Sequence, residues 1–164
     1  MKIVSFLSLD SLLPMKNGKN RLLGLDLGNK TIGISTSDTT WFIATPLTLI
    51  RRTNTCNDLN ALSKIIQEYE VAGIVIGYPL NMNGTEGPQG QKIKIFIEHF
   101  SESNPTPIVL WDERLSTVAV TKTLLKADMS RKRRSEVVDK MAASYILQGA
   151  LDYLQRIQRE NIKG

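Results

Sequence analysis

The sequence is nearly devoid of the two side chains that most often bind zinc or form disulfides. Its 164 residues include a single cysteine, Cys56, and a single histidine, His99. One cysteine excludes an intrachain disulfide and favours a reducing compartment, so we expect a cytoplasmic protein. One cysteine and one histidine also argue against a structural zinc site, which takes four ligands, mostly of these two types. Any metal site must therefore be built from other side chains.

The sequence also lacks a long apolar run. No segment approaches the ~20 apolar residues that a membrane-spanning helix needs, so we expect no membrane partner. Residues 1–14 are apolar enough to suggest a signal peptide, but Asp10 interrupts them and no small-residue cleavage site follows. Turn-forming residues 17–20 (NGKN) then separate this segment from the rest. We expect residues 1–20 to be an N-terminal extension, flexible or partly packed, and residues 21–160 to form one domain.

The composition is that of an ordinary globular domain with a modest positive charge. Hydrophobic residues make up 41% of the chain, and its length suits one hydrophobic core. Lysine and arginine outnumber aspartate and glutamate by 21 to 16, which gives a formal net charge of +5. This excess is compatible with a polyanionic partner such as nucleic acid, without requiring one.

Hydrophobic periodicity predicts three strands followed by alternating helices and strands. The expected elements are a two-stranded hairpin at 22–37, a strand at 44–51, a helix at 58–69, a strand at 73–76, a helix from Pro88 to Phe100, a strand at 108–111, a helix from Ser116 or Thr117 to about Lys126, and a helix from Ser135 to about Arg159. This order predicts an α/β fold with a mixed five-stranded sheet and helices on both faces.

The hairpin at residues 22–37, LLGLDLGNKTIGISTS, carries an acid at the end of its first strand. Strand alternation puts Leu23, Leu25 and Leu27 on one face and Asp26 on the other, between Gly24 and Gly28. We expect open space above this carboxylate, where a phosphate or a metal ion could approach the backbone. The alternative is a solvated aspartate before a hairpin turn.

Acidic residues also end the last predicted strand and begin the last predicted helix. Asp112 and Glu113 lie at the carboxyl end of that strand, where sites form in open α/β sheets. Alternation puts these two acids on opposite faces, and spacing does not tell which one joins Asp26. Asp139 shares a helix face with alanines at i+4 and i+11, so it points inward, where an unpaired carboxylate is costly. The alternative for Asp139 is a stabilising interaction with its helix N-terminus.

A cluster of carboxylates without histidine or cysteine suits Mg²⁺ or Mn²⁺ rather than zinc. Such a cluster could hold two ions ~3.5–4 Å apart for phosphodiester hydrolysis. Basic residues near the acids could bind phosphate and make binding salt-dependent, although each could equally be part of a solvated surface. These residues are Lys30, Arg114, Arg131, Lys132, Arg133 and Arg134.

Four segments together resemble, in order and spacing, the YqgF/RuvX family, whose members are described as Holliday-junction resolvases or pre-16S rRNA nucleases. The segments are LDLGNKTIGIS, GYPLNMNGTEGPQ, WDERLST and SRKRRSEVVDKMAASYIL, and the match runs over residues 21–153. The resemblance implies an RNase H-like fold and a bacterial, cytoplasmic role in maturation of the 5′ end of 16S rRNA. It also implies that the catalytic and metal-binding acids are Asp26, Glu113 (with Asp112 as the alternative) and Asp139.

The leading hypothesis from the sequence is a two-metal-ion nuclease that acts on structured RNA such as pre-rRNA. One alternative is the same chemistry on a four-way DNA junction, which would favour a homodimer with two sites over a monomer. A second is a non-catalytic RNA-binding factor for ribosome assembly, which would use the basic residues and not need the acids. An ATPase of the actin and sugar-kinase type needs a second lobe, for which 164 residues leave no room.

Overall fold

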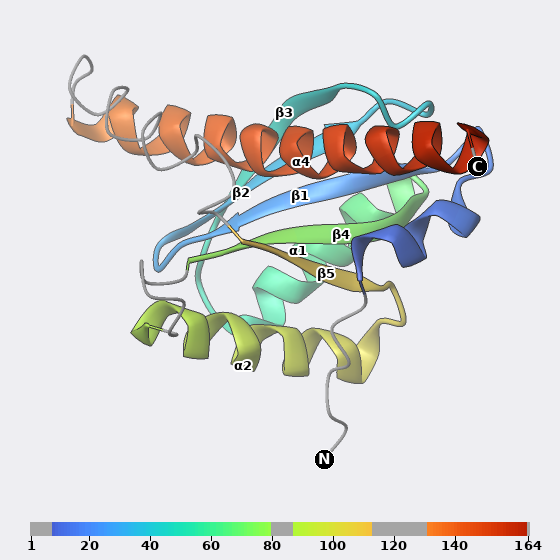
Figure 1. Cartoon of the computed structure of the whole chain (residues 1–164). Helices are drawn as coiled ribbons and strands as arrows, with labels where there is room; N and C mark the ends of the chain where they lie inside the picture. Colours follow the sequence, from blue (N-terminus) through green and yellow to red (C-terminus); the bar gives the residue numbers. More distant parts are fainter. Residues whose placement is uncertain (1–7, 80–86, 113–130, 164) are drawn as a thin grey trace.

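The structure, a computed structural model, describes residues 8–79, 87–112 and 131–163, and for residues 131–139 and 161–163 it describes the backbone alone. The described residues form a five-stranded sheet in the order β3-β2-β1-β4-β5, with helices on both faces (Figure 1). This is the mixed α/β architecture that the order of apolar segments predicts.

The first three strands are antiparallel neighbours, and the last two are parallel to the first. β1 (Arg21–Leu27) pairs with β2 (Thr31–Ser37), which pairs with β3 (Ala44–Arg51). β4 (Val71–Tyr78) runs parallel to β1, and β5 (Ile108–Asp112) runs parallel to β4. The carboxyl ends of β1, β4 and β5 therefore meet at one edge of the sheet.

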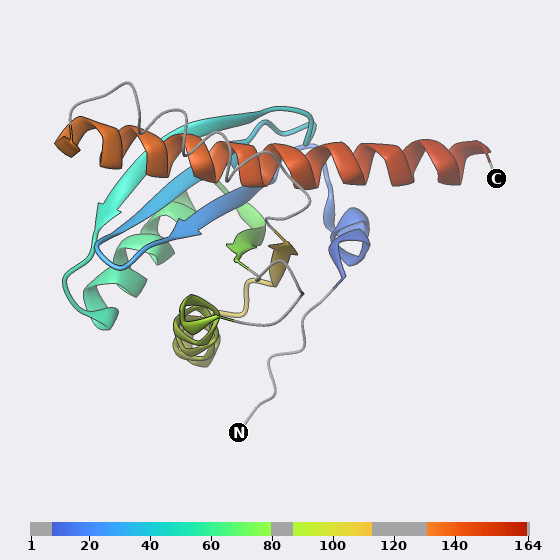
Figure 2. The ribbon, with the colours of Figure 1, turned by 60° about the vertical axis from the view of Figure 1, so that its left-hand side comes forward.

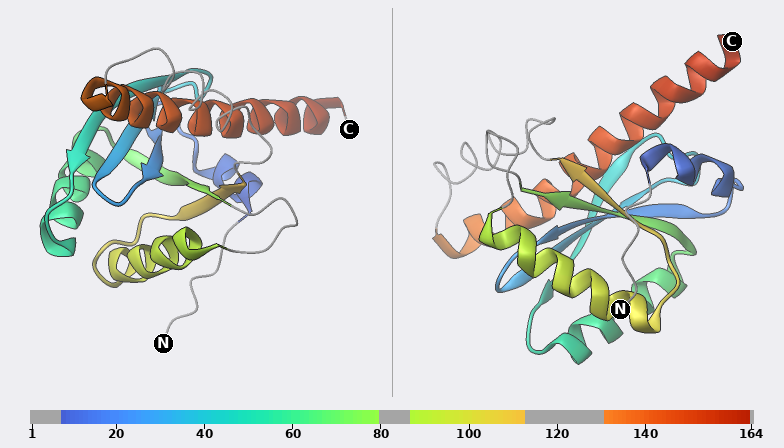
Figure 3. Two further views of the ribbon diagram at one scale, coloured as in Figure 1. Left: turned by 90° about the vertical axis from the view of Figure 1, so that its left-hand side faces the viewer. Right: turned by 60° about the horizontal axis from the view of Figure 1, so that its bottom comes forward.

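Two layers of helices enclose the sheet (Figures 2 and 3). α1 (Thr55–Glu68) and α2 (Pro88–Ser103) pack on one face, where Leu23, Leu25 and Leu27 of β1 contribute to an apolar cluster. α4 (Arg131–Lys163) and the short 3₁₀ helix η1 (Leu9–Met15) pack on the other face and share a second apolar cluster. The helix predicted to begin at Ser116 or Thr117 lies outside the described residues.

Two helices begin earlier than the sequence pattern predicts. α4 begins at Arg131 instead of Ser135, so the basic run forms its first turn. Arginine and lysine favour helix about as strongly as leucine, so nothing in the run prevents the helix from starting there. α1 begins at Thr55 instead of residue 58, because Asn54 caps the helix. No apolar residue marks this additional first turn, so hydrophobic periodicity did not detect it.

The space above Gly24, one of the two glycines that flank Asp26 on its face of the strand, is filled by α4. A Cβ atom on Gly24 would lie 2.6 Å from the Cβ of Leu147 and 2.7 Å from the carbonyl oxygen of Ala143. The same carbonyl accepts a hydrogen bond of 2.7 Å from the hydroxyl of Ser35 on β2. Gly24 thus serves the close approach of helix and sheet, a role that sequence alternation alone cannot distinguish from ligand access.

The N-terminal segment is packed against the domain from Leu9 onward. Leu9 and Leu12 of η1 are buried in the cluster beneath α4. Gly73 of β4 makes room for this packing, since a Cβ atom there would lie 2.9 Å from a methyl carbon of Leu12. Leu12 is therefore a core residue, although it precedes the first strand by nine positions.

We expect Gly24→Ala to destabilise the protein by about 1–3 kcal/mol, because the new methyl group meets the backbone of α4 and cannot be accommodated by a rotamer change. Urea unfolding followed by circular dichroism measures the effect. Gly149→Ala, on α4, is the comparison and should cost less, because its Cβ would meet the side-chain ring of Trp111 at 3.1 Å rather than backbone, and alanine favours the helix. An unchanged unfolding midpoint for Gly24→Ala would contradict this account of the helix–sheet contact.

Leu12→Ala should cost about 2–5 kcal/mol of stability, because it leaves a cavity in the cluster shared by η1, β4 and α4. Thermal unfolding measures this loss. Met15→Ala, at an exposed position of the same 3₁₀ helix, should leave the melting temperature nearly unchanged. Equal melting temperatures for the two variants would show that η1 contributes nothing to the folded domain.

Candidate active site

Asp26 is a buried acid near the carboxyl end of the central strand β1. Only 8% of its surface is exposed. Leu25 and Leu27, its neighbours in the chain, belong to the apolar cluster under α1 and α2, whereas Leu22 belongs to the cluster under α4. Because side chains alternate along a strand, Asp26 lies on the face that α4 covers.

α4 carries Asp139 toward the same end of the sheet. The helix runs antiparallel to β1 (Figures 1 and 2) and touches it where Ala143 meets Gly24. From that contact, Asp26 lies two strand residues away, or ~7 Å. Asp139 lies four helix residues away in the same direction, or ~6 Å. The backbone therefore brings these two positions to one end of the molecule, while the side chain of Asp139 is outside the described part of the structure.

The faces of β5 distinguish between the two acids at its end. Val109 and Trp111 pack in the cluster under α4, whereas Ile108 and Leu110 pack on the opposite face. Alternation along β5 therefore assigns Asp112, its last residue, to the face opposite Asp26. Glu113, the other candidate, lies outside the described residues.

The basic residues predicted to bind phosphate are only partly described. Lys30 lies exposed at the turn between β1 and β2, close to Asp26 in the chain. Residues 131–134 form the first turn of α4, without described side chains, and Arg114 lies outside the described residues. Among the side chains that the structure describes, no group of three or more histidines, cysteines, aspartates or glutamates could hold a metal ion. The side chains of two of the three predicted acids, Glu113 and Asp139, are not among those described.

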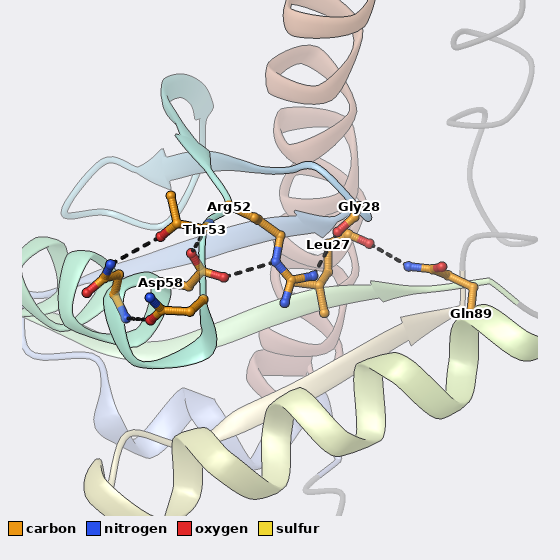
Figure 4. A network of polar contacts seen from close by, with 8 residues as sticks. Leu27, Gly28, Arg52, Thr53, Asp58 and Gln89 are labelled. Atoms are coloured by element: carbon orange, nitrogen blue, oxygen red, sulfur yellow. Dashed lines mark hydrogen bonds and ion pairs between the residues drawn. The ribbon is translucent and has the colours of Figure 1, made fainter.

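A polar network behind the β1–β2 turn was not found by sequence reasoning (Figure 4). The Nη1 of Arg52 donates to the carbonyl oxygen of Gly28 at 2.9 Å, and the Nε2 of Gln89 donates to that of Leu27 at 2.9 Å. The Nε of Arg52 lies 3.1 Å from the carboxylate of Asp58, a buried residue that is only 2% exposed. An acid in the first turn of α1 and a glutamine at the start of α2 were the available signals, and both resemble ordinary helix starts.

Two aromatic residues that could stack on nucleic-acid bases are instead core residues. Trp41 packs in the cluster under α4, and its Nε1 donates to the carbonyl oxygen of Asn20 at 3.1 Å. Tyr78 packs in the cluster under α1 and α2. Neither ring presents a stacking surface.

Within the described residues, no helix is long and apolar enough to cross a membrane.

Comparisons with known proteins identify the family of this chain. A family model described as "RuvX: Holliday junction resolvase" matches residues 20–153. A protein of Paracoccus denitrificans (strain Pd 1222) named "Putative pre-16S rRNA nuclease" is 53% identical over 136 residues, covering 83% of this chain and 86% of the relative. A protein of the same name from Thermoanaerobacter pseudethanolicus (strain ATCC 33223 / 39E) is 53% identical over 133 residues, covering 80% of this chain and 96% of the relative.

Among solved structures, Thermus thermophilus RuvC in complex with a Holliday junction substrate is similar to this chain, with a TM-score of 0.52 and 9% sequence identity. The similarity covers 84% of this chain and 96% of that chain, and it confirms the RNase H-like fold class. The family model spans most of the chain, and relatives at 53% identity match it along most of their own length. As its four motifs predict, this chain belongs to the RuvX family.

Proposed function

We propose that this protein is a metal-dependent nuclease that hydrolyses phosphodiester bonds in the 5′ region of pre-16S rRNA, in the cytoplasm. The observation that carries the proposal is the position of Asp26, a buried acid at the edge of the sheet where β1, β4 and β5 end. Sites in open α/β sheets form at this edge, and a carboxylate there supplies the hard oxygen ligand that Mg²⁺ and Mn²⁺ prefer. The shared name of relatives at 53% identity supports the choice of substrate.

The proposed ligand set is Asp26, Glu113 and Asp139. Asp26 and Asp139 are supported by the antiparallel course of α4 over β1, which carries both positions to one end of the sheet. Glu113 is preferred to Asp112, because β5 assigns Asp112 to the face that α2 covers. All three groups are hard oxygen ligands, so the set fits Mg²⁺ or Mn²⁺ better than zinc.

Two divalent ions held by such carboxylates would supply an activated water and stabilise the negative charge on the leaving oxygen. The chain itself contributes position and charge. Asp26 is held rigid by the central strand, and the contact between Gly24 and Ala143 sets the distance between strand and helix. Lys30, Arg114 and residues 131–134 would bind backbone phosphates beside the acids, so that binding weakens as salt rises.

A four-way DNA junction is the second candidate substrate, because the matching family model is described as a Holliday junction resolvase. Symmetric cleavage of a junction requires two sites, which a homodimer would present. Trimming of one RNA strand requires a single site, which a monomer would supply. The substrate and the oligomeric state are therefore linked, and one set of experiments can address both.

We expect Asp26→Asn to lower metal-dependent cleavage of a labelled precursor 16S 5′-leader RNA by roughly 100-fold or more. Loss of a residue behind a metal ligand typically costs 10–100-fold, and loss of the ligand should cost at least as much. Cleavage is measured in Mg²⁺, in Mn²⁺ and in EDTA, beside a synthetic four-way DNA junction. Asp152→Asn, an exposed position on the far half of α4, is the matched control and should cleave like the wild type.

Each of the other outcomes would support a different function for the protein. Symmetric cutting of the junction by a dimer, with the RNA left intact, would identify a resolvase. If neither substrate is cut while wild type and Asp26→Asn bind the RNA equally, the protein is a non-catalytic assembly factor. Wild-type cleavage by Asp26→Asn would remove Asp26 from the site and with it the central argument for the proposal.

A further inference from the structure

The backbone that follows Asp26 leaves the β-ladder on one side. The pairs between β1 and β4 end at Leu25 and Ile76, one residue before Asp26. On the other side, the N–H of Gly28 still donates to the carbonyl oxygen of Thr31, which closes the turn. Toward β4, the carbonyl of Leu27 has therefore passed the end of the ladder, and buried carbonyls of this kind need another donor.

Side chains from two other elements supply donors to this segment. The Nε2 of Gln89 donates to the carbonyl oxygen of Leu27, and the Nη1 of Arg52 donates to that of Gly28, each at 2.9 Å (Figure 4). These carbonyls belong to the first and second residues after Asp26. Gln89 and Arg52 thus hold the chain immediately beyond the acid, a segment that pairing with β4 no longer reaches.

Arg52 is itself held in place. Its Nε pairs with the carboxylate of Asp58 at 3.1 Å, and the other oxygen of that carboxylate accepts the N–H of Thr53 at 3.2 Å. The backbone N–H of Arg52 donates to the carbonyl oxygen of Lys30 at 2.8 Å, so Arg52 contacts the β1–β2 turn twice. Its guanidinium group also lies 5.7 Å from the ring centre of Phe96. These contacts leave the guanidinium little freedom to move away from Gly28.

Gln89 is placed by the way α2 meets β4. It lies in the first turn of α2, next to Gly90. A Cβ atom on Gly90 would lie 2.6 Å from the hydroxyl oxygen of Tyr78, the last residue of β4. The absence of a side chain at Gly90 therefore lets the start of α2 lie against the end of β4. This close approach brings the amide of Gln89 within reach of Leu27 on β1.

We propose that Gln89 and Arg52 are positioning residues, which fix the backbone beyond Asp26 so that its carboxylate is held ready to bind a divalent ion. This inference rests on the proposed function, because it takes Asp26 as a metal ligand. Sites of this kind must be held to within about 0.5 Å, and partners behind the ligands typically account for 10–100-fold in metal affinity or activity. Neither residue needs to touch the RNA.

The decisive variant is Gln89→Met, which keeps the length of the side chain and removes its donor. We expect Mn²⁺ binding, measured by isothermal titration calorimetry without RNA, to weaken roughly 10–100-fold. In cleavage assays at a fixed metal concentration, kcat should fall while KM for the RNA stays unchanged. Binding of the RNA in EDTA should equal that of the wild type, since no phosphate contact has been removed.

Gln148→Met is the matched control. The Nε2 of Gln148 donates to the carbonyl oxygen of Phe42 at 2.9 Å, a bond equal to that of Gln89 in type and length. The amide of Gln148 also donates to the carboxylate of Asp152 and accepts the N–H of Ala44, so its loss removes more hydrogen bonds than the loss of Gln89. The bond to Phe42 joins α4 to the β2–β3 connection, at the end of β2 opposite the β1–β2 turn. Gln148→Met should lower stability at least as much as Gln89→Met and leave Mn²⁺ affinity unchanged. Equal weakening of Mn²⁺ binding in both variants would overturn the proposal, because the effect would then be one of general stability.

Arg52→Lys provides a second test, with the charge retained. A lysine has one ammonium nitrogen, which cannot occupy the positions of both guanidinium nitrogens that contact Asp58 and Gly28. We expect an intermediate loss of Mn²⁺ affinity. Wild-type affinity and kcat in both Gln89→Met and Arg52→Lys would overturn the inference and leave the proposed function standing. By contrast, wild-type Mn²⁺ affinity in Asp26→Asn would remove the proposed function itself.

Discussion

The contact between α4 and β1 sets the geometry on which the rest of the molecule depends. A strand and a helix can approach this closely only where one of them has no side chain, and Gly24 supplies that position. The Ser35 hydroxyl donates a hydrogen bond to the carbonyl oxygen of Ala143. This bond fixes the position of α4 along its axis, and the contact at Gly24 fixes its distance from the sheet. Asp26 follows this contact along β1 and Asp139 precedes it along α4. A shift of α4 would therefore move the two acids relative to each other.

The same end of the molecule combines opposing electrostatic demands. Carboxylates gathered at the sheet edge would repel one another and would repel a phosphate. Cations at the β1–β2 turn and in the first turn of α4 would attract the same phosphate. Divalent ions would turn the negative charge of the acid cluster positive and leave the surrounding cations unchanged. Metal binding and nucleic-acid binding should therefore favour each other. The network of Arg52, Asp58 and Gln89 keeps the backbone fixed while these charges change.

Much of the fold follows from local patterns, whereas contacts between distant segments do not. The face of Asp26 was predictable because strand alternation has a period of two residues. The covering of Gly24 was not, because alternation says which residues share a face and nothing about what lies above it. Gln89 and Leu27 are 62 residues apart, and no local pattern links them. The face of Asp112 was not predictable either, since only the packing of Val109 and Trp111 tells which face of β5 belongs to α4.

The hydrogen bond between Ser35 and Ala143 joins residues that are 108 positions apart. At translation rates of roughly 5–20 residues per second, the ribosome needs about 5–20 s to make the chain between them. During that interval β1 and β2 exist without their covering helix, and the other two acids of the proposed set, Glu113 and Asp139, are added only in its later part. A chain with the proposed activity would therefore be unable to cut RNA while it is being synthesised. It would become active only once α4 had emerged from the ribosome.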